Sequence, residues 1–154
     1  MVVIDTDVLL LAFAFQTDVR QTENHRFLWE VQTAVPAVTV YTLMELLGKL
    51  SFNLAPERLE QWQSWLIAAY QLEVVWPVAP NTPVTYLSWH DLLFSRPFQR
   101  MKTVKMPFMD ALILDLAEQV QATCFVTWNA RHFREKSSLP IWTPSEFLAL
   151  EFDN

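Results

Sequence analysis

Three carboxylates and one amide stand in stretches of mainly apolar sequence, where a polar side chain usually has a specific partner or a function. They are Asp5, Glu45, Asp110 and Asn129. Hard oxygen donors of this kind suit Mg²⁺ or Mn²⁺ rather than zinc. If the fold brings the four side chains together, the chemistry they offer is that of a divalent metal site.

Each of these residues also has a purely structural interpretation. Asp5 is a favoured N-cap for a following helix, and Asp110 lies in a predicted first turn, where the helix dipole favours negative charge. Glu45 precedes Lys49 by four residues, the spacing of a helical ion pair. Asn129 follows a predicted strand, where asparagine commonly forms a turn. Both interpretations of each residue therefore stand until the fold is considered.

The elements that must position these residues alternate between short strands and helices. The strands are predicted over 2–4, 37–39, 72–76, 124–127 and 141–142. The helices are predicted over 8–15, 23–32, 40–50, 56–70, 83–94 and 107–121. A terminal helix is predicted to open at the capping box formed by Thr143 and Glu146. This alternation predicts an α/β fold, in which a parallel sheet carries helices on both faces and binds ligands at the carboxyl ends of its strands.

Two local features complete this prediction. Thr6 or Asp7 is expected to cap the first helix, because both residue types can accept hydrogen bonds from backbone amides. The stretch 96–105 contains Pro97 and is predicted to be a loop. It lies within residues 92–109, which hold basic residues and no Asp or Glu, so a basic surface is expected there.

Composition limits the class of protein. The chain has 154 residues, of which 52% are hydrophobic and 18% charged, and this predicts one folded domain over residues 1–154. The formal net charge of −6 excludes a basic nucleic-acid coat protein. Dinucleotide-binding and P-loop sites are excluded because they need several glycines and the chain has only Gly48. The lone Cys124, the lack of a secretory signal and the short apolar runs predict a cytoplasmic protein with no membrane span.

In their order and spacing, the motifs resemble those of the PIN-domain nucleases, and in particular the VapC-type toxins of bacterial toxin–antitoxin pairs. Residues 3–10 are similar to the family's opening strand and first acidic motif, and residues 44–47 to its glutamate helix. Residues 110–118 are similar to its third motif, 125–133 to its fourth, and 142–148 to its C-terminal end. The resemblance covers nearly the whole chain and implies a PIN-like fold with a central parallel sheet of four to five strands and helices on both faces.

Carried over residue by residue, the resemblance implies roles for individual side chains. The implied catalytic and metal-site residues are Asp5, Glu45, Asp110 and Asn129. Asn129 stands where the family often has Asp, which lowers the charge of the site by one. The hydroxyls of Thr6 and Thr127 are implied to support the cluster. Asp7 stands where Asn or Ser is common, and it is predicted to cap the first helix rather than to add a ligand.

The resemblance further implies a metal-dependent endoribonuclease, in which Mg²⁺ or Mn²⁺ lowers the pKa of a bound water for hydrolysis of an RNA phosphodiester. Basic residues flanking the site are predicted to contact the RNA backbone. They are Arg96, Arg100, Lys102, Lys105, Arg131, His132 and Arg134. A homodimer and a small antitoxin protein are the implied protein partners, and the seven Trp and eleven Phe agree with such contacts.

Two other functions are compatible with parts of the sequence. Asn129 in place of Asp is also expected in a PIN-like domain that has lost catalysis and acts as an RNA- or protein-binding module. Asp5 and Asp7 match the Asp-x-Asp pattern of haloacid-dehalogenase-type phosphatases, but Val8 and Leu9 stand where that family has Gly-Thr. The nuclease is therefore the leading hypothesis and the binding module the alternative.

Overall fold

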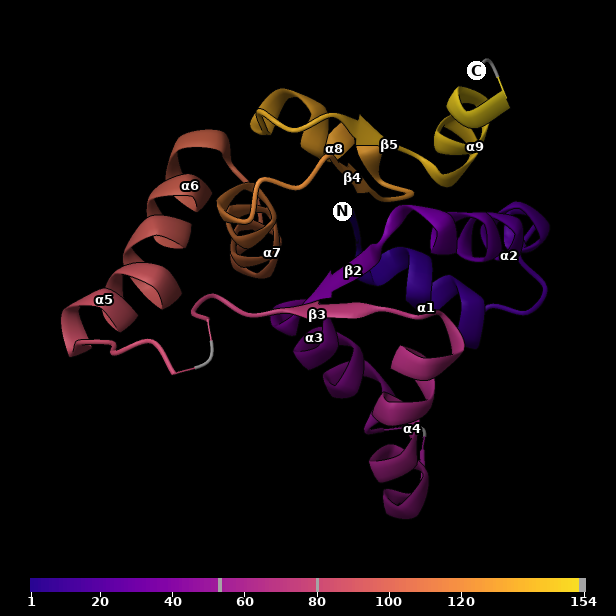
Figure 1. Ribbon diagram of the computed structural model, residues 1–154, viewed down its shortest axis with the longest axis horizontal. Helices are drawn as coiled ribbons and strands as arrows, with labels where there is room; N and C mark the ends of the chain where they lie inside the picture. Colours follow the sequence, from indigo (N-terminus) through magenta and orange to yellow (C-terminus); the bar gives the residue numbers. More distant parts are fainter. Residues whose placement is uncertain (53, 80, 153–154) are drawn as a thin grey trace.

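A parallel sheet forms the centre of the molecule. The computed structural model describes residues 1–52, 54–79 and 81–152. Within them, a five-stranded sheet has the order β3-β2-β1-β4-β5, all pairs parallel (Figure 1). Its strands are β1 Val2–Ile4, β2 Pro36–Thr39, β3 Glu73–Val75, β4 Cys124–Val126 and β5 Ile141–Trp142. The predicted α/β architecture is confirmed.

The strand sequences explain why this sheet is parallel and buried. Every residue of β1, β2 and β4 is buried, and apart from Thr39 at the end of β2 these strands are apolar throughout rather than alternating. In the register, Val3 lies beside Ala37 of β2 on one side and Phe125 of β4 on the other. The carboxyl ends of β1, β2 and β4 therefore meet at one edge of the sheet.

Helices connect the strands and cover both faces. The α-helices are α1 Thr6–Ala14, α2 Gln21–Glu30, α3 Val40–Leu50, α4 Pro56–Ala69, α5 Tyr86–His90, α6 Arg96–Val104, α7 Phe108–Gln119, α8 Ala130–Phe133 and α9 Pro144–Phe152. The shorter turns are the 3₁₀ helices η1 Val31–Ala34 and η3 Arg134–Lys136 and the π-helical turn η2 Asp91–Ser95. Among the described residues, no helix is long and apolar enough to cross a bilayer.

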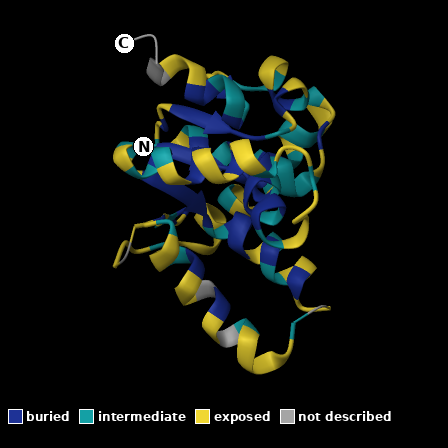
Figure 2. Cartoon of the chain, turned by 90° about the vertical axis from the view of Figure 1, so that its right-hand side faces the viewer, coloured by how far each residue is buried: buried dark blue, intermediate teal, exposed yellow. Residues whose placement is uncertain are grey.

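The sheet separates two hydrophobic cores. Ile4 of β1 belongs to the core formed with α1, α2, α4 and α9, whereas its neighbour Val3 belongs to the core formed with α7 and α8. Residues of α3 contribute to both. Figure 2 shows the buried residues concentrated on the strands and on the inner faces of the helices, with exposed residues on the outer faces. Because consecutive strand side chains point to opposite faces, each three-residue strand serves both cores.

The predicted capping box at the last helix is confirmed. The backbone amide of Thr143 donates to the Glu146 carboxylate at 2.8 Å, and the amide of Glu146 donates to Thr143 Oγ1 at 3.2 Å. Two amides at the start of α9 are thereby satisfied.

The prediction of a loop over 96–105 is wrong, because this stretch contains α6. The chain is helical from Tyr86 through α5, η2 and α6, and it ends at Lys105, whose φ of 53° is left-handed. The amide of Arg96 bonds to the carbonyl of Asp91, five residues earlier. This wider turn precedes Pro97, which has no amide to donate, so the helix accommodates the proline without ending.

Candidate active site

A pocket lies at the carboxyl ends of β1 and β4, and all four of the predicted metal-site residues line it. Its volume is about 160 Å³. We call it the acidic pocket; its lining residues are Asp5, Thr6, Asp7, Glu45, Lys49, Asp110, Asn129 and Phe133. The pocket therefore joins residues up to 128 positions apart in the sequence, from Asp5 to Phe133.

Asp5 occupies the corner where β1 turns into α1. Its side chain is 8% exposed, and its Oδ1 accepts a hydrogen bond from the Thr6 amide at 2.7 Å. Its own amide donates to the carbonyl of Val126 in β4 at 2.9 Å. The cap of α1 is therefore Asp5, which confirms the structural interpretation of this residue, and the prediction of Thr6 or Asp7 as that cap is wrong. Backbone pairing with β4 fixes the position of this carboxylate.

Glu45 forms the predicted ion pair with Lys49 and also lines the acidic pocket, while its role as a metal ligand stays a prediction. Thr6 Oγ1 donates to Glu45 Oε2 at 2.6 Å, so the two predicted neighbours of the site are in contact. On the other side, Lys49 Nζ lies 2.9 Å from Glu45 Oε1, one helical turn along α3. The carboxylate is therefore held from both sides at the edge of the acidic pocket.

Asp7 has a role that the sequence did not reveal. Its carboxylate accepts three hydrogen bonds from the turn after β4: from Thr127 Oγ1 at 3.0 Å, the Trp128 amide at 3.2 Å and the Asn129 amide at 3.1 Å. Thr127 Oγ1 also accepts from the Asn129 amide at 3.0 Å. Asp7 thus fastens the first turn of α1 to the turn that carries Asn129. The only signal for this role is that the polar residue follows β1, which neighbours β4.

Asp110, in the first turn of α7, faces α8. His132 Nε2 lies 3.3 Å from Asp110 Oδ2, and His132 Nδ1 lies 3.3 Å from Lys136 Nζ. Asp115, five residues further along α7, instead pairs with Arg96 at 3.2 Å and does not line the acidic pocket. This agrees with the helical geometry, which turns five residues by about 140°.

Burial and mutual proximity make these carboxylates difficult to ionise. Burial raises the pKa of Asp5 well above its usual range, and the charge of Asp7 raises it further. Burial also raises the pKa of Asp7, against the hydrogen bonds from Trp128, Thr127 and Asn129. The pKa of Asp110 is raised by burial too, although the nearby His132 opposes the shift. A cation placed in the acidic pocket would favour the ionised forms.

The donor set fits the chemistry of Mg²⁺ or Mn²⁺. The acidic pocket offers carboxylate and amide oxygens and no sulfur, as these cations prefer. In the described part of the chain, however, no three His, Cys, Asp or Glu side chains are gathered closely enough to ligate one ion together. The assignment of Asp5, Glu45, Asp110 and Asn129 as ligands therefore stays a prediction.

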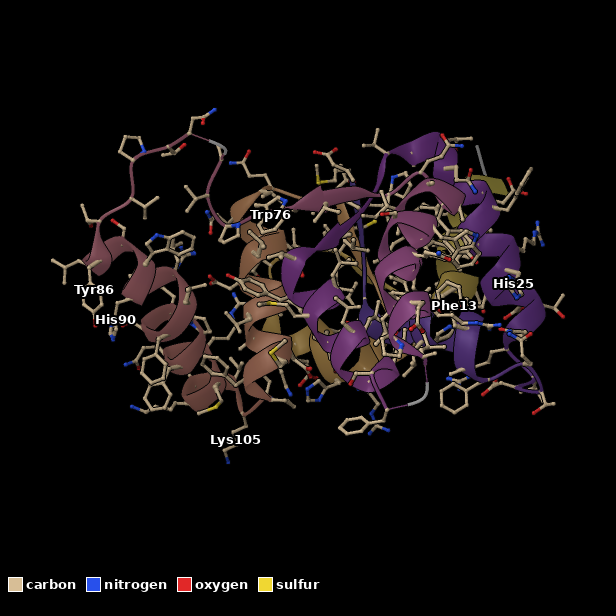
Figure 3. All side chains as sticks on the ribbon, turned by 90° about the horizontal axis from the view of Figure 1, so that it is seen from below. Phe13, His25, Trp76, Tyr86, His90 and Lys105 are labelled. Carbon is tan, nitrogen blue, oxygen red and sulfur yellow. The ribbon has the colours of Figure 1, made fainter. Side chains whose placement is uncertain are left out.

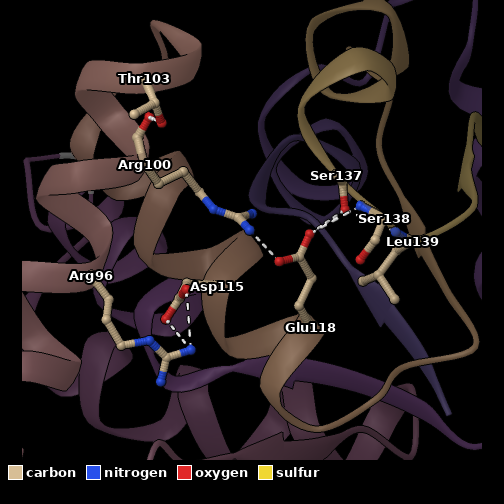
Figure 4. Close-up of polar contacts among 8 residues, drawn as sticks. All are labelled: Arg96, Arg100, Thr103, Asp115, Glu118, Ser137, Ser138 and Leu139. Carbon is tan, nitrogen blue, oxygen red and sulfur yellow. Dashed lines mark hydrogen bonds and ion pairs between the residues drawn. The ribbon is translucent and has the colours of Figure 1, made fainter.

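Three of the basic residues predicted to contact RNA form ion pairs within the chain. Figure 4 shows Arg96 of α6 with Asp115 and Arg100 with Glu118, both on α7. Arg134 pairs with Glu146 of α9. Lys102, Lys105 and Arg131 are exposed and form no ion pair among the described residues. In Figure 3 the side chain of Lys105 points away from the body of the molecule. None of these residues is yet tested as an RNA contact.

Comparison with known proteins relates the chain to solved structures rather than to sequences. No family model matches it, and no curated protein has significant sequence similarity to it. The VapBC2 complex from Rickettsia felis, bound to a DNA fragment from its promoter, matches with a TM-score of 0.67 and 17% identity, over 93% of this chain and 98% of the other.

Two further solved structures match over similar lengths. FitAB bound to an IR36 DNA fragment matches with a TM-score of 0.63 and 16% identity, over 94% of this chain and 95% of the other. FitAcB from Neisseria gonorrhoeae matches with a TM-score of 0.62 and 14% identity, over 94% and 99%. At these identities the shared property is the fold. The chain has the PIN-like fold, the fold of the VapC and FitB toxin chains in these complexes.

Proposed function

We propose that this protein is a Mg²⁺- or Mn²⁺-dependent endoribonuclease and the toxin of a type II toxin–antitoxin pair. The observation that carries the proposal is the acidic pocket, in which Asp5, Glu45, Asp110 and Asn129 meet at the carboxyl ends of the parallel strands. Ligand sites of α/β sheets lie at this edge. The likeness to the VapBC2 and FitAB structures supports the toxin assignment.

Some of these residues are proposed to bind the cation, and others hold the binding residues in place. Asp5, Glu45 and Asp110 would hold the cation through carboxylate oxygens, and Asn129 through its amide oxygen. A cation held there would supply an acidified water molecule and neutralise charge on the phosphate. Thr6 orients Glu45, and Asp7 holds the turn that presents Asn129. The chain then needs no nucleophile of its own.

The proposal is tested by cleavage of a pool of structured RNAs with Mg²⁺, with Mn²⁺ and with chelator. Asp5→Asn is expected to reduce cleavage more than about 100-fold, because it removes one of the three negative charges proposed to hold the cation. Asn keeps the cap of α1, so the fold should persist. Asp115→Asn is the matched control: it makes the same change five residues beyond Asp110 and outside the acidic pocket, and should leave cleavage intact.

A melting curve adds a readout that is independent of the RNA substrate. Mn²⁺ should raise the melting temperature of the wild type and of Asp115→Asn, but not of Asp5→Asn. Cleavage that persists with chelator or in Asp5→Asn would contradict the nuclease proposal. Metal stabilisation without cleavage of any RNA would instead favour the alternative, a PIN-like binding module that has lost catalysis.

The partners proposed for the protein are RNA, a second copy of the chain and a small antitoxin. The antitoxin is supported by the solved structures of similar fold, since VapBC2 and FitAB are toxin–antitoxin complexes. A second copy is supported by large apolar side chains exposed on α5 and η2. Co-purification with the product of a neighbouring reading frame would test the antitoxin directly.

A further inference from the structure

A second hollow adjoins the acidic pocket on the side of α8 and η3. Its volume is about 330 Å³. We call it the Arg131 hollow; its lining residues are Asn129, Arg131, His132, Glu135 and Lys136. Asn129 lines both cavities, so the two lie on either side of this residue.

The two cavities carry opposite charge. The acidic pocket has Asp5, Asp7, Glu45 and Asp110 against Lys49 alone. The Arg131 hollow has Arg131 and Lys136 against Glu135 alone, with His132 as a further nitrogen donor. An anion is therefore attracted to the hollow by the chain itself, whereas it would enter the acidic pocket only beside a bound cation.

Contacts within the hollow fix one of its cations and leave the other available. Lys136 Nζ donates to the carbonyl of Lys105 at 3.1 Å and lies 3.3 Å from His132 Nδ1. Its ammonium is thereby held in place with a third proton to donate. Arg131 is exposed and forms no ion pair in the described residues, and its planar guanidinium matches the two free oxygens of a phosphodiester.

We propose that the Arg131 hollow binds the phosphodiester of RNA that neighbours the one to be cut. The inference rests on the proposed function, because it takes the acidic pocket as the place of the cut phosphate. A polyanion with regularly spaced phosphates can occupy both cavities at once, one phosphate beside the metal and the next between Arg131 and Lys136. The hollow thus sets the position of the chain relative to the metal and adds affinity without a base contact.

The test is binding of a labelled oligouridylate, measured by fluorescence anisotropy over a range of salt concentrations at constant Mg²⁺. All proteins carry Asp5→Asn, which keeps the RNA intact and is expected to leave the acidic pocket without its cation, so that the assay reports binding by the hollow's own charges. Arg131→Met and Lys136→Met are each expected to weaken binding about tenfold and to lower the slope of log affinity against log salt by about 0.7, the loss for one phosphate contact to a single strand. Arg58→Met on α4 removes the same charge from the far side of the molecule in Figure 1 and should change neither.

Each result decides the proposal. It is overturned if Arg131→Met binds with the affinity and slope of Arg58→Met, or if the parent protein binds no oligouridylate. Because Lys136 also bonds to Lys105, a lower affinity in Lys136→Met counts only if its melting temperature is unchanged. Arg131 forms no ion pair among the described residues, so its variant needs no such condition. Cleavage by the otherwise wild-type protein is assayed separately. If the protein binds RNA through the hollow but cleaves none, the result contradicts the proposed nuclease activity and still supports phosphate binding by the hollow.

Discussion

At the scale of single residues, the acidic pocket brings together carboxylates whose negative charges are unfavourable at this position. Asp5 is buried beside Asp7, and Asp110 is partly buried with His132 as its nearby nitrogen group. Burial and like charge both disfavour ionised carboxylates, so ionising them in the folded protein costs free energy. Divalent cations would reverse this cost, which links metal binding to stability.

The raised pKa of Asp5 makes the free energy of unfolding depend on pH in one direction. The pKa of Asp5 is raised in the folded protein. At pH values above about 4, the ordinary pKa of aspartate, the native state therefore keeps a proton that the unfolded chain has lost. The free energy of unfolding therefore falls as pH rises through that interval. In chelator at neutral pH, Asp5→Asn should melt above the wild type, by about 3 °C for each kcal/mol gained.

Melting curves recorded in chelator at several pH values check this prediction. The difference between Asp5→Asn and the wild type should disappear below the ordinary titration range of aspartate, where both side chains are neutral. Glu73→Gln, at an exposed carboxyl on β3, is the control and should show no such trend. A lower melting temperature for Asp5→Asn at neutral pH would contradict the prediction.

At the scale of elements, two ion pairs hold α6 against α7. Arg96 pairs with Asp115, and one turn further on Arg100 pairs with Glu118 (Figure 4). Glu118 Oε1 also accepts from Ser137 Oγ at 2.7 Å and from the Ser138 amide at 3.2 Å, so the same carboxylate anchors the segment after η3. The stretch of basic residues is therefore partly a packing surface rather than a wholly free one.

Removal of the second ion pair should be costly. Arg100 and Glu118 are 18% and 20% exposed, and Arg100→Met leaves part of the Glu118 carboxylate without its partner. We expect the free energy of unfolding to fall by about 2 kcal/mol, the range for hydrogen bonds to charged groups. Lys102→Met, on the same helix but exposed, should cost less than about 1 kcal/mol. Urea denaturation compares the two, and equal losses would contradict the structural role of Arg100.

At the scale of the whole molecule, the segment from α5 to α6 extends away from the sheet (Figure 1). Tyr86 and His90 lie at this end of the molecule in Figure 3. Several large apolar side chains are exposed along the same segment: Tyr86, Leu87, Trp89, Leu93 and Phe94. Such a patch on successive helical turns is typical of a surface that is covered by a partner.

We expect a second copy of the chain to cover this patch. Leu87 is 76% exposed, and Leu87→Glu places a charge in the proposed contact. The wild type should sediment as a dimer and Leu87→Glu as a monomer of unchanged helicity. Trp29→Glu is the matched control, because Trp29 is 74% exposed but lies on α2. A monomeric wild type, or a dimeric Leu87→Glu, would contradict the prediction.

The sequence by itself determined the architecture of this protein and the set of residues at its carboxyl edge. Short, β-branched apolar runs ending at Asp5 and before Asn129 favour buried strands, and parallel strands bring their carboxyl ends to one edge. The capping box at Thr143 was predictable for a related reason, since its two hydrogen bonds join residues three positions apart. Patterns of this kind depend on neighbours in the chain.

Only the tertiary structure decided which partner each polar group finds. Asp7 bonds to the turn at 127–129, and Arg96 and Arg100 find carboxylates on α7, so 96–104 is a helix despite Pro97. The Arg131 hollow likewise exists because α8 and η3 lie beside the acidic pocket. Hydrogen bonds and ion pairs act over a few ångströms, so their partners depend on which elements the fold places side by side, and spacing along the chain does not encode that.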